Sequence, residues 1–362
     1  MTAAREWADR ALADVMDRVA VTASEVGERF PLFADPDSGR WTTTRRGTWT
    51  GGFWAGLLWL RAHHTGHAAD RAVASACTGR LAEWVDADTA TRGLILWYGT
   101  ALAYGDGEAA EAAALRNEAA RACLSAVEPE LGLVPWGSAF GGERLLARVD
   151  GVPGMVPLLT EAGPDGATAA AAHLHRHLEL CLGDGALVPS WRFDTDTGWH
   201  ACDDPPSGWS RGRAWLLLAV ADALLRSGVV AWNTTRLESA AARLACVQEE
   251  PSGRLVPLAD ATRPDGPPDT SAAAITSVAL MKLARSPGPR AAEYSRRAHA
   301  ILELLVTAHL TGPGEKRPAG MLLDGCYDAA RGTAPCHELV WGDFFLALAL
   351  AAHTGLVDIR CV

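Results

Sequence analysis

Six helix starts rich in glycine, tryptophan and aspartate recur along this chain and constrain its fold more than any other feature. They occupy residues 48–54, 89–94, 148–151, 208–215, 269–275 and 339–345. Each opens an apolar helix-forming segment, and these segments alternate with others that carry a polar stripe. Repeated units of this kind predict a series of helical hairpins.

Apolar periodicity predicts twelve helical segments, because alanine, leucine and arginine dominate and strand-like alternation is rare. We place them at residues 3–28, 50–64, 68–86, 93–104, 107–125, 150–162, 166–182, 208–226, 235–249, 270–285, 289–309 and 337–353. Six hairpins closed in a ring form an all-α (α/α)6 barrel, with apolar helices inside and amphipathic helices outside. No linker divides the chain, so we expect residues 1–362 to form a single domain, with short strands confined to connections such as 185–193.

Charge and cysteine content exclude several classes of partner. Lys and Arg number 33 against 43 Asp and Glu, a net charge of −10 with no block of like charges, so neither nucleic acid nor a membrane surface is expected. The N-terminus has no apolar signal core, and no apolar run reaches the roughly 18 residues of a membrane span. The 8 cysteines are scattered without a CxxC pair, which favours a reduced cytoplasm. The oligomeric state is left open.

The barrel places all six starts at one end, where a pocket is expected. Helix N-termini carry partial positive charge and free N–H groups, so such a pocket favours an anionic ligand. The chain has 14 Trp against 4 Tyr, and Trp49 and Trp136 are among those in loops or at helix starts. Indole rings suit the apolar faces of sugars, although any one of them is also explained as core.

Asp150 and Arg211 are the charged residues with the most informative positions. Asp150 lies in the stretch 148–151 at the mouth of a helix, where it is either a general acid or an N-cap. Arg211 lies in a first helical turn, where a cation opposes the helix dipole, so it needs an anionic partner. That partner is either a ligand or an internal carboxylate. Trp215 shares the helix face of Arg211, whereas Arg213 points elsewhere.

Other candidates have structural interpretations. Asp269 and Asp343 resemble caps of helix starts. His173 and His177 form an i, i+4 pair on an expected outer helix, but a metal site requires a third ligand. The sequence has neither a Gly-rich phosphate loop nor a Gly-x-Ser-x-Gly elbow. We therefore expect no metal and no cofactor.

With these motifs in order, the sequence resembles the family 88 glycoside hydrolases, the unsaturated glucuronyl hydrolases. The resemblance extends from about residue 30 to residue 353. It is carried by Trp-Thr-x-Gly-Phe-Trp-x-Gly-x-x-Trp-Leu (49–60), Arg-Val-Asp-Gly (148–151), Phe-Asp-x-x-Thr-Gly (193–198), Trp-Ser-Arg-Gly-x-Ala-Trp (209–215), Asp-x-Ser-Ala-Ala-Ala-Ile (269–275) and Trp-Gly-Asp-Phe-Phe (341–345). Together these motifs are specific, and none would be so alone.

The resemblance implies the (α/α)6 fold and an activity on unsaturated uronosyl residues. In that chemistry a carboxylic acid protonates C4 of a vinyl ether and water adds at C5. The hemiketal that results then rearranges and releases the other sugar. The resemblance places the acid at Asp150 and lines the pocket with Trp49, Trp136, Arg211 and Trp215. A small anionic saccharide or glycoside is the implied partner.

The sequence departs from the family pattern at two motifs. Where the family carries Thr-x-Thr-His-Asp-Leu-Gly-Phe, with a second catalytic-site aspartate, this chain has Arg92-Gly93 in place of His-Asp. Arg213 replaces a usual glutamine, and His200 is near the segment of a usual pocket histidine. One carboxylate is lost and two arginines are gained, so we add Arg92, Arg213 and His200 to the substrate-binding set and expect a more anionic substrate.

Three functions are compatible with these departures. The first is a divergent hydrolase with Asp150 as acid, in which Asp86 or Asp88 could replace the missing carboxylate. The second is a natural-product pathway enzyme on the same scaffold that acts on another small molecule. The third is a non-catalytic sugar- or anion-binding protein.

Overall fold

The computed structural model describes residues 3–104, 108–183, 186–226, 232–246 and 254–362. In this part of the chain the α-helices are α1 (Ala3–Val26), α2 (Gly51–Thr65), α3 (Ala68–Gly79), α4 (Tyr98–Thr100), α5 (Glu108–Ser125), α6 (Met155–Thr160), α7 (Gly163–Cys181), α8 (Ser210–Leu225), α9 (Thr234–Leu244), α10 (Thr270–Leu283), α11 (Ala291–Leu304) and α12 (Val340–Thr354). Each predicted helical segment overlaps one of them, with differences at the ends. Residues 107, 185 and 247–249 of the predicted elements lie outside the described residues.

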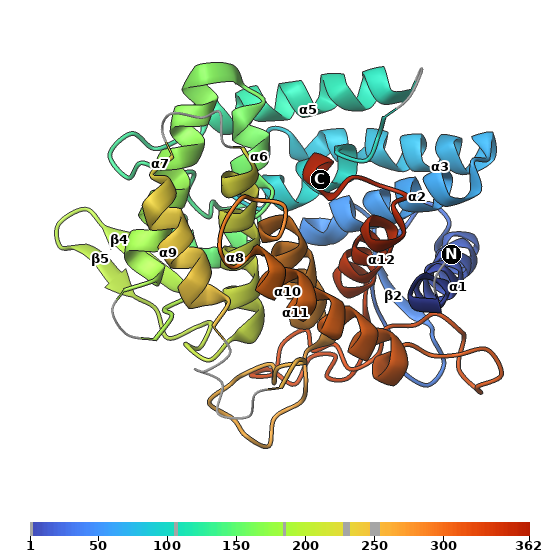
Figure 1. Cartoon of the computed structure of the whole chain (residues 1–362). Coiled ribbons are helices and arrows are strands. Elements are labelled where there is room, and N and C mark those ends of the chain that lie inside the picture. Colours follow the sequence, from blue (N-terminus) through green and yellow to red (C-terminus); the bar gives the residue numbers. More distant parts are fainter. Residues whose placement is uncertain (1–2, 105–107, 184–185, 227–231, 247–253) are drawn as a thin grey trace.

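The helices form two concentric rings, as Figure 1 shows. The even-numbered helices follow one another around the inner ring, with α4 joined to α6 through the π-helical residues 93–97, and α12 closes the ring by packing against α2. The odd-numbered helices cover them, and α1 packs against α12. Burial follows this division: α12 is buried almost throughout its length, whereas α9 buries only a stripe at helical spacing. The predicted (α/α)6 barrel is confirmed.

Aromatic side chains from four inner helices fill the barrel axis. Phe53 stacks on Tyr98 at a centroid distance of 5.2 Å, and Trp215 meets Phe345 edge-on at 5.5 Å. Phe344 packs against Phe345 at 5.1 Å. All five rings are fully or almost fully buried. Because this plug closes the middle of the barrel, a cavity can open only towards its ends.

Two inner segments are irregular where the backbones of Gly93 and Gly154 cross. Residues 93–97 form a π-helical turn, and the predicted helix 150–162 is instead a 3-10 turn at 149–151 followed by α6. Gly154 has a φ of 70°, which breaks the helix. A Cβ on Gly93 would lie 2.2 Å from the amide nitrogen of Met155. Glycine is therefore required at position 93 by the close approach of two chains.

We expect Gly93→Ala to lower the free energy of unfolding by roughly 1–3 kcal/mol or more, since the added methyl group must displace backbone. Gly79→Ala is the matched control, because a Cβ there meets nothing within 4 Å and alanine favours the helix by about 0.5–1 kcal/mol. Urea denaturation of both variants measures the difference. Equal stability of the two variants would contradict the crossing.

In the described ranges, six short strands lie in the connections between helices. One sheet has the order β2-β1-β6, built from β1 (Phe30–Ala34), β2 (Trp41–Thr44) and β6 (Glu338–Leu339). The other has the order β3-β4-β5, built from β3 (Leu146–Arg148), β4 (Ser190–Asp194) and β5 (Gly198–Ala201). The strand expected within 185–193 is β4. The second sheet leads directly into the Asp150 turn and so helps to fix its position.

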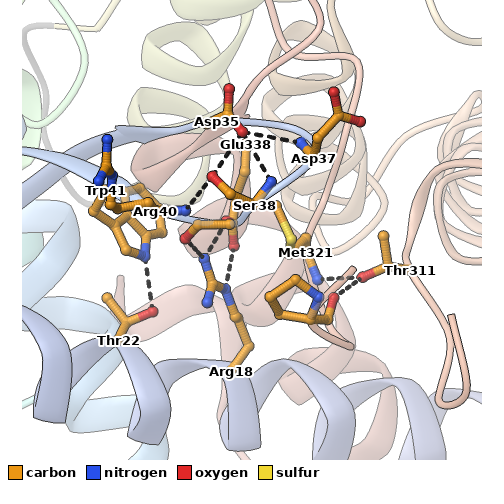
Figure 2. A network of polar contacts seen from close by, with 12 residues as sticks. Arg18, Thr22, Asp35, Asp37, Ser38, Arg40, Trp41, Thr311, Met321 and Glu338 are labelled. Atoms are coloured by element: carbon orange, nitrogen blue, oxygen red, sulfur yellow. Dashed lines mark hydrogen bonds and ion pairs between the residues drawn. The ribbon is translucent and has the colours of Figure 1, made fainter. Parts of the chain in front are cut away.

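A buried ion pair joins the first outer helix to the start of the last inner helix. Figure 2 shows Arg18 of α1 donating to both carboxylate oxygens of Glu338, at 3.0 and 2.7 Å, with side chains only 3% and 0% exposed. Nearby, the Trp41 indole donates to Thr22 of α1. These contacts hold the ends of the chain together at the closure of the ring.

Asp343 is a second buried carboxyl group beside this pair. It is not the cap expected from the sequence, because α12 begins at Val340 and Asp343 lies one turn inside it. Its Oδ1 has no hydrogen-bond partner among the described residues. Burial and the neighbouring Glu338 raise the pKa of Asp343 well above its usual value.

We therefore expect Asp343→Asn to stabilise the protein increasingly as pH rises. A raised carboxyl pKa means that the folded state holds a proton that the unfolded state releases above about pH 4, so stability falls with rising pH by up to about 1.4 kcal/mol per unit. Asparagine removes this dependence. Urea midpoints between about pH 5 and about pH 8 measure it, and a constant difference between the two proteins would contradict it.

The structure also describes the state of the cysteines and the apolar character of the helices. All 8 cysteines are free thiols, and four of them are buried. Among the described helices none has both the length and the apolar character needed to cross a bilayer.

Candidate active site

A cavity of about 750 Å³ opens at the end of the barrel where the inner helices begin. Four of the six helix starts contribute to its lining: Trp49 before α2, Thr91 and Leu94 around the π-helical turn, Asp150 before α6 and Arg211 in α8. The starts 269–275 and 339–345 do not line it, and the loops that precede them supply Asp260 and Tyr327 instead. The arrangement predicted from the repeated starts is therefore found for four of the six. The volume lies in the range of small-molecule sites.

Asp150 lies in this cavity and is not a helix cap. The 3-10 turn at 149–151 has no side-chain cap. Both carboxylate oxygens instead accept hydrogen bonds from Arg148, from Nε at 3.0 Å and from Nη2 at 3.1 Å. The Asp150 side chain is 16% exposed. A bidentate pair of this kind is the strong form of a carboxylate–guanidinium contact.

Trp136 completes a three-layer arrangement around Asp150. The guanidinium carbon of Arg148 lies 4.4 Å from the centroid of the Trp136 ring, so the cation is held between the indole and the carboxylate. The Trp136 backbone nitrogen donates to the carbonyl of Leu146, and its carbonyl accepts from Ala90. The tryptophan loop is therefore tied to both neighbouring walls of the cavity.

Trp49 and Trp215 also line the cavity. Trp49 packs against Trp341 at a centroid distance of 4.8 Å and donates from its indole nitrogen to the hydroxyl of Tyr327 at 3.4 Å. Trp215 is almost fully buried against the axial aromatic plug. These two tryptophans therefore add to the aromatic surface of the cavity.

Arg211 lines the cavity but its terminal nitrogens already have protein partners. Nη1 donates to Asp269 at 2.6 Å and to the carbonyl of Cys326, and Nη2 donates to the carbonyl of Tyr327. Asp269 also caps α10 by accepting from Ser271, as expected. Of the two interpretations left open by the sequence, the internal salt bridge is the one found. Arg211 holds the loop before α12 in place.

The structure does not bring Arg92, Arg213 and His200 into the described lining of the cavity, which corrects the expectation for these three residues. Arg92 is buried and donates to the carbonyls of Thr89 and Val85. Arg213 donates to the carbonyl of Cys246 on the outer layer. His200 bonds Thr197 within the β4–β5 hairpin. Each side chain faces away because its helix or hairpin turns it from the axis.

Neither upstream aspartate lies in the described lining of the cavity. Asp88 accepts from the backbone and hydroxyl of Ser138 and from Arg144, which holds it in the outer part of the loop. Asp86 is exposed. At position 93 the crossing with Met155 leaves no space for a side chain, so the wall there consists of Thr91 and Leu94.

Several charged residues of the cavity were missed in the sequence because they lie in loops. The additional lining residues with charge are Arg148, Asp203, Asp204, Asp260, Arg263, Asp328 and Arg331. Arg331 donates to Asp328 at 2.6 Å and to Asp204 at 2.8 Å, so it joins the loops before α8 and α12 across the mouth. The aspartates balance the arginines, and the cavity is not the cationic one expected from Arg92 and Arg213. In the sequence, these loop residues could have been recognised by their proximity to the helix starts 208–215 and 339–345.

No arrangement of three or more metal-ligating side chains occurs among the residues with described positions. His173 and His177, the candidate pair, are fully buried. Burial lowers the pKa of His177 to about 4. Both histidines therefore serve packing and hydrogen bonding.

The chain is similar to known proteins over nearly its full length. No protein-family model matches the chain. It is 28% identical over 372 residues to an unsaturated glucuronyl hydrolase of Bacillus sp. (strain GL1), a match that covers 94% of this chain and 95% of that protein. An unsaturated glucuronyl hydrolase from Streptococcus agalactiae has a fold with a TM-score of 0.84 at 17% identity, covering 99% of this chain and 94% of its own. A variant from that organism complexed with dGlcA-GalNAc6S gives 0.74 at 18% identity, over 98% and 90%.

The solved structures place the chain in the class of (α/α)6-barrel proteins. Within that class it is a homologue of the unsaturated glucuronyl hydrolases, the family 88 glycoside hydrolases, and the resemblance read from the six motifs is confirmed.

Proposed function

We propose that this protein hydrolyses saccharides or glycosides that end in an unsaturated uronosyl residue, with Asp150 as the acid. The observation that carries the proposal is the place of Asp150 in the cavity lined by four of the inner helix starts. Homology over nearly the full length supports the reaction type. The complex of the homologue with dGlcA-GalNAc6S supports a substrate of disaccharide size.

The proposed reaction is hydration of a vinyl ether. Asp150, in its acid form, delivers a proton to C4, and the positive charge that develops at C5 is taken up by the ring oxygen. Water adds at C5 and loses a proton, which gives a hemiketal. The hemiketal opens to a ketone, and the former anomeric carbon then releases the second sugar as an alcohol. One water molecule is consumed for each linkage.

Arg148 faces Asp150 through the bidentate pair. A uronate carboxylate in the cavity offers Arg148 another anionic partner. In the proposed cycle, Arg148 exchanges its contact with Asp150 for a contact with the substrate carboxylate. Trp136 and Trp49 supply aromatic surfaces for the sugar rings.

The lining favours a substrate with the single carboxylate of a uronosyl group. Asp203, Asp204, Asp260 and Asp328 balance the cavity arginines, and Arg211 is already paired. The expectation of a more heavily charged substrate depended on Arg92 and Arg213, which lie elsewhere. We retain as a second candidate a non-catalytic saccharide-binding protein, since the Arg148–Asp150 pair gives the site a neutral resting form.

The two candidates differ in one experiment. The purified protein is incubated with an unsaturated uronosyl disaccharide and, in parallel, with its saturated counterpart, and release of the second sugar is followed. The proposed function predicts release from the unsaturated substrate alone. Binding of the unsaturated disaccharide without release would support the second candidate, and equal cleavage of both would contradict vinyl-ether hydration.

A further inference from the structure

His173 connects the two segments that carry Trp136 and Asp150. It lies on the buried face of α7 and has no exposed surface. Its Nδ1 accepts a hydrogen bond from the backbone nitrogen of Val134 at 3.2 Å. Its Nε2 lies 3.3 Å from the carbonyl oxygen of Gly151. Val134 is two residues from Trp136, and Gly151 directly follows Asp150.

These two partners determine the form of the ring. An amide N–H can only donate, so Nδ1 carries no proton, and a carbonyl oxygen can only accept, so Nε2 carries one. His173 is therefore the neutral tautomer with the proton on Nε2. Burial, with His177 beside it at a centroid distance of 4.4 Å, keeps the pKa of His173 well below its usual value and favours this neutral form.

We propose that His173 is a positioning residue, which fixes the distance between the tryptophan loop and the Asp150 turn from beneath the cavity. This inference rests on the proposed function for its kinetic consequences. The stack of Trp136, Arg148 and Asp150 requires that both segments keep their separation. The imidazole bonds both backbones, and its rigid ring sets a constant spacing between the acceptor and the donor.

Two substitutions separate the two contacts. In His173→Asn the side-chain oxygen reaches the place of Nδ1, so the variant keeps the Val134 contact and loses the Gly151 contact. In His173→Gln the amide nitrogen reaches the place of Nε2, so it keeps Gly151 and loses Val134. We expect the asparagine variant to lose roughly tenfold or more in kcat with KM nearly unchanged, because the acid is misplaced. We expect the glutamine variant to raise KM several-fold with kcat nearly unchanged.

Leu174→Ala is the matched control, because Leu174 is the next residue of α7 and is equally buried. It should lower the urea midpoint of unfolding, because it truncates a core side chain. Leu174→Ala should neither lower kcat alone nor raise KM alone. A purely structural role for His173 predicts that all three variants change the two constants in the same way, and that result would overturn the proposal.

Hydrogen–deuterium exchange makes the test independent of turnover. We expect faster exchange confined to residues 149–152 in His173→Asn and to residues 131–136 in His173→Gln, with the rest of the barrel unchanged. If the wild-type protein releases no sugar, the proposed function fails, yet the exchange pattern still decides the positioning role. Unchanged exchange at both segments in both variants would overturn it.

Discussion

Asp150→Asn is expected to lower kcat for the unsaturated disaccharide by roughly 10²–10⁴-fold, the range that a general acid contributes. Asparagine has nearly the size of aspartate and still accepts a hydrogen bond from Arg148, so the stack on Trp136 should persist. The amide cannot supply the proton for C4. KM should therefore change little, and the initial rate of sugar release measures the loss.

Asp86→Asn is the control for this variant, because Asp86 is exposed and outside the cavity lining. It should retain wild-type kcat. The same control tests whether an upstream aspartate takes part in the reaction. A comparable loss in Asp86→Asn, or full activity in Asp150→Asn, would contradict the assignment of the acid.

Arg18→Met is expected to lower the free energy of unfolding by about 3–5 kcal/mol, since removing one partner of a buried ion pair leaves the other charge unpaired. Glu338 is fully buried and Asp343 lies beside it, so the variant holds two carboxyl groups without their cation. The loss should shrink between about pH 8 and about pH 5, because protonated Glu338 is less costly to bury. Urea denaturation across this range measures it.

Arg46→Met provides the comparison. Arg46 pairs with Glu83 at 2.6 Å, but these side chains are 56% and 42% exposed. An exposed pair contributes about 0–1 kcal/mol, so this variant should be nearly as stable as the wild type. Equal losses of unfolding free energy in the two variants would contradict a larger contribution from the buried Arg18 pair.

The architecture was predictable because it depends on periodicity. The apolar segments and their glycine- and tryptophan-rich starts repeat six times. A closed ring of six helical hairpins accommodates all six repeats. Local crossings were not predictable. The break at Gly154 depends on its contact with Gly93, a residue far away in the sequence, and nothing near position 154 indicates that partner.

The candidate site was predictable where it coincides with a helix start. Asp150, Trp49 and Trp215 lie in the cavity for this reason. Arg92 and Arg213 were misplaced because a position in a first turn does not say which way a long side chain points. The roles of Arg148 and His173 were missed because they depend on tertiary contacts. Arg148 contacts Asp150 and Trp136, and His173 contacts the backbone beside each of these two residues. That residues 1–362 form a single domain stays a prediction.

In the proposed reaction the double bond is hydrated before the linkage opens. Vinyl-ether absorbance and release of the second sugar are followed in the same reaction with the wild-type protein. Hydration first predicts equal molar amounts of double bond lost and sugar released, with the loss of absorbance never behind the release of sugar. Release of sugar while the absorbance persists would mean direct displacement at the anomeric carbon, and would contradict it.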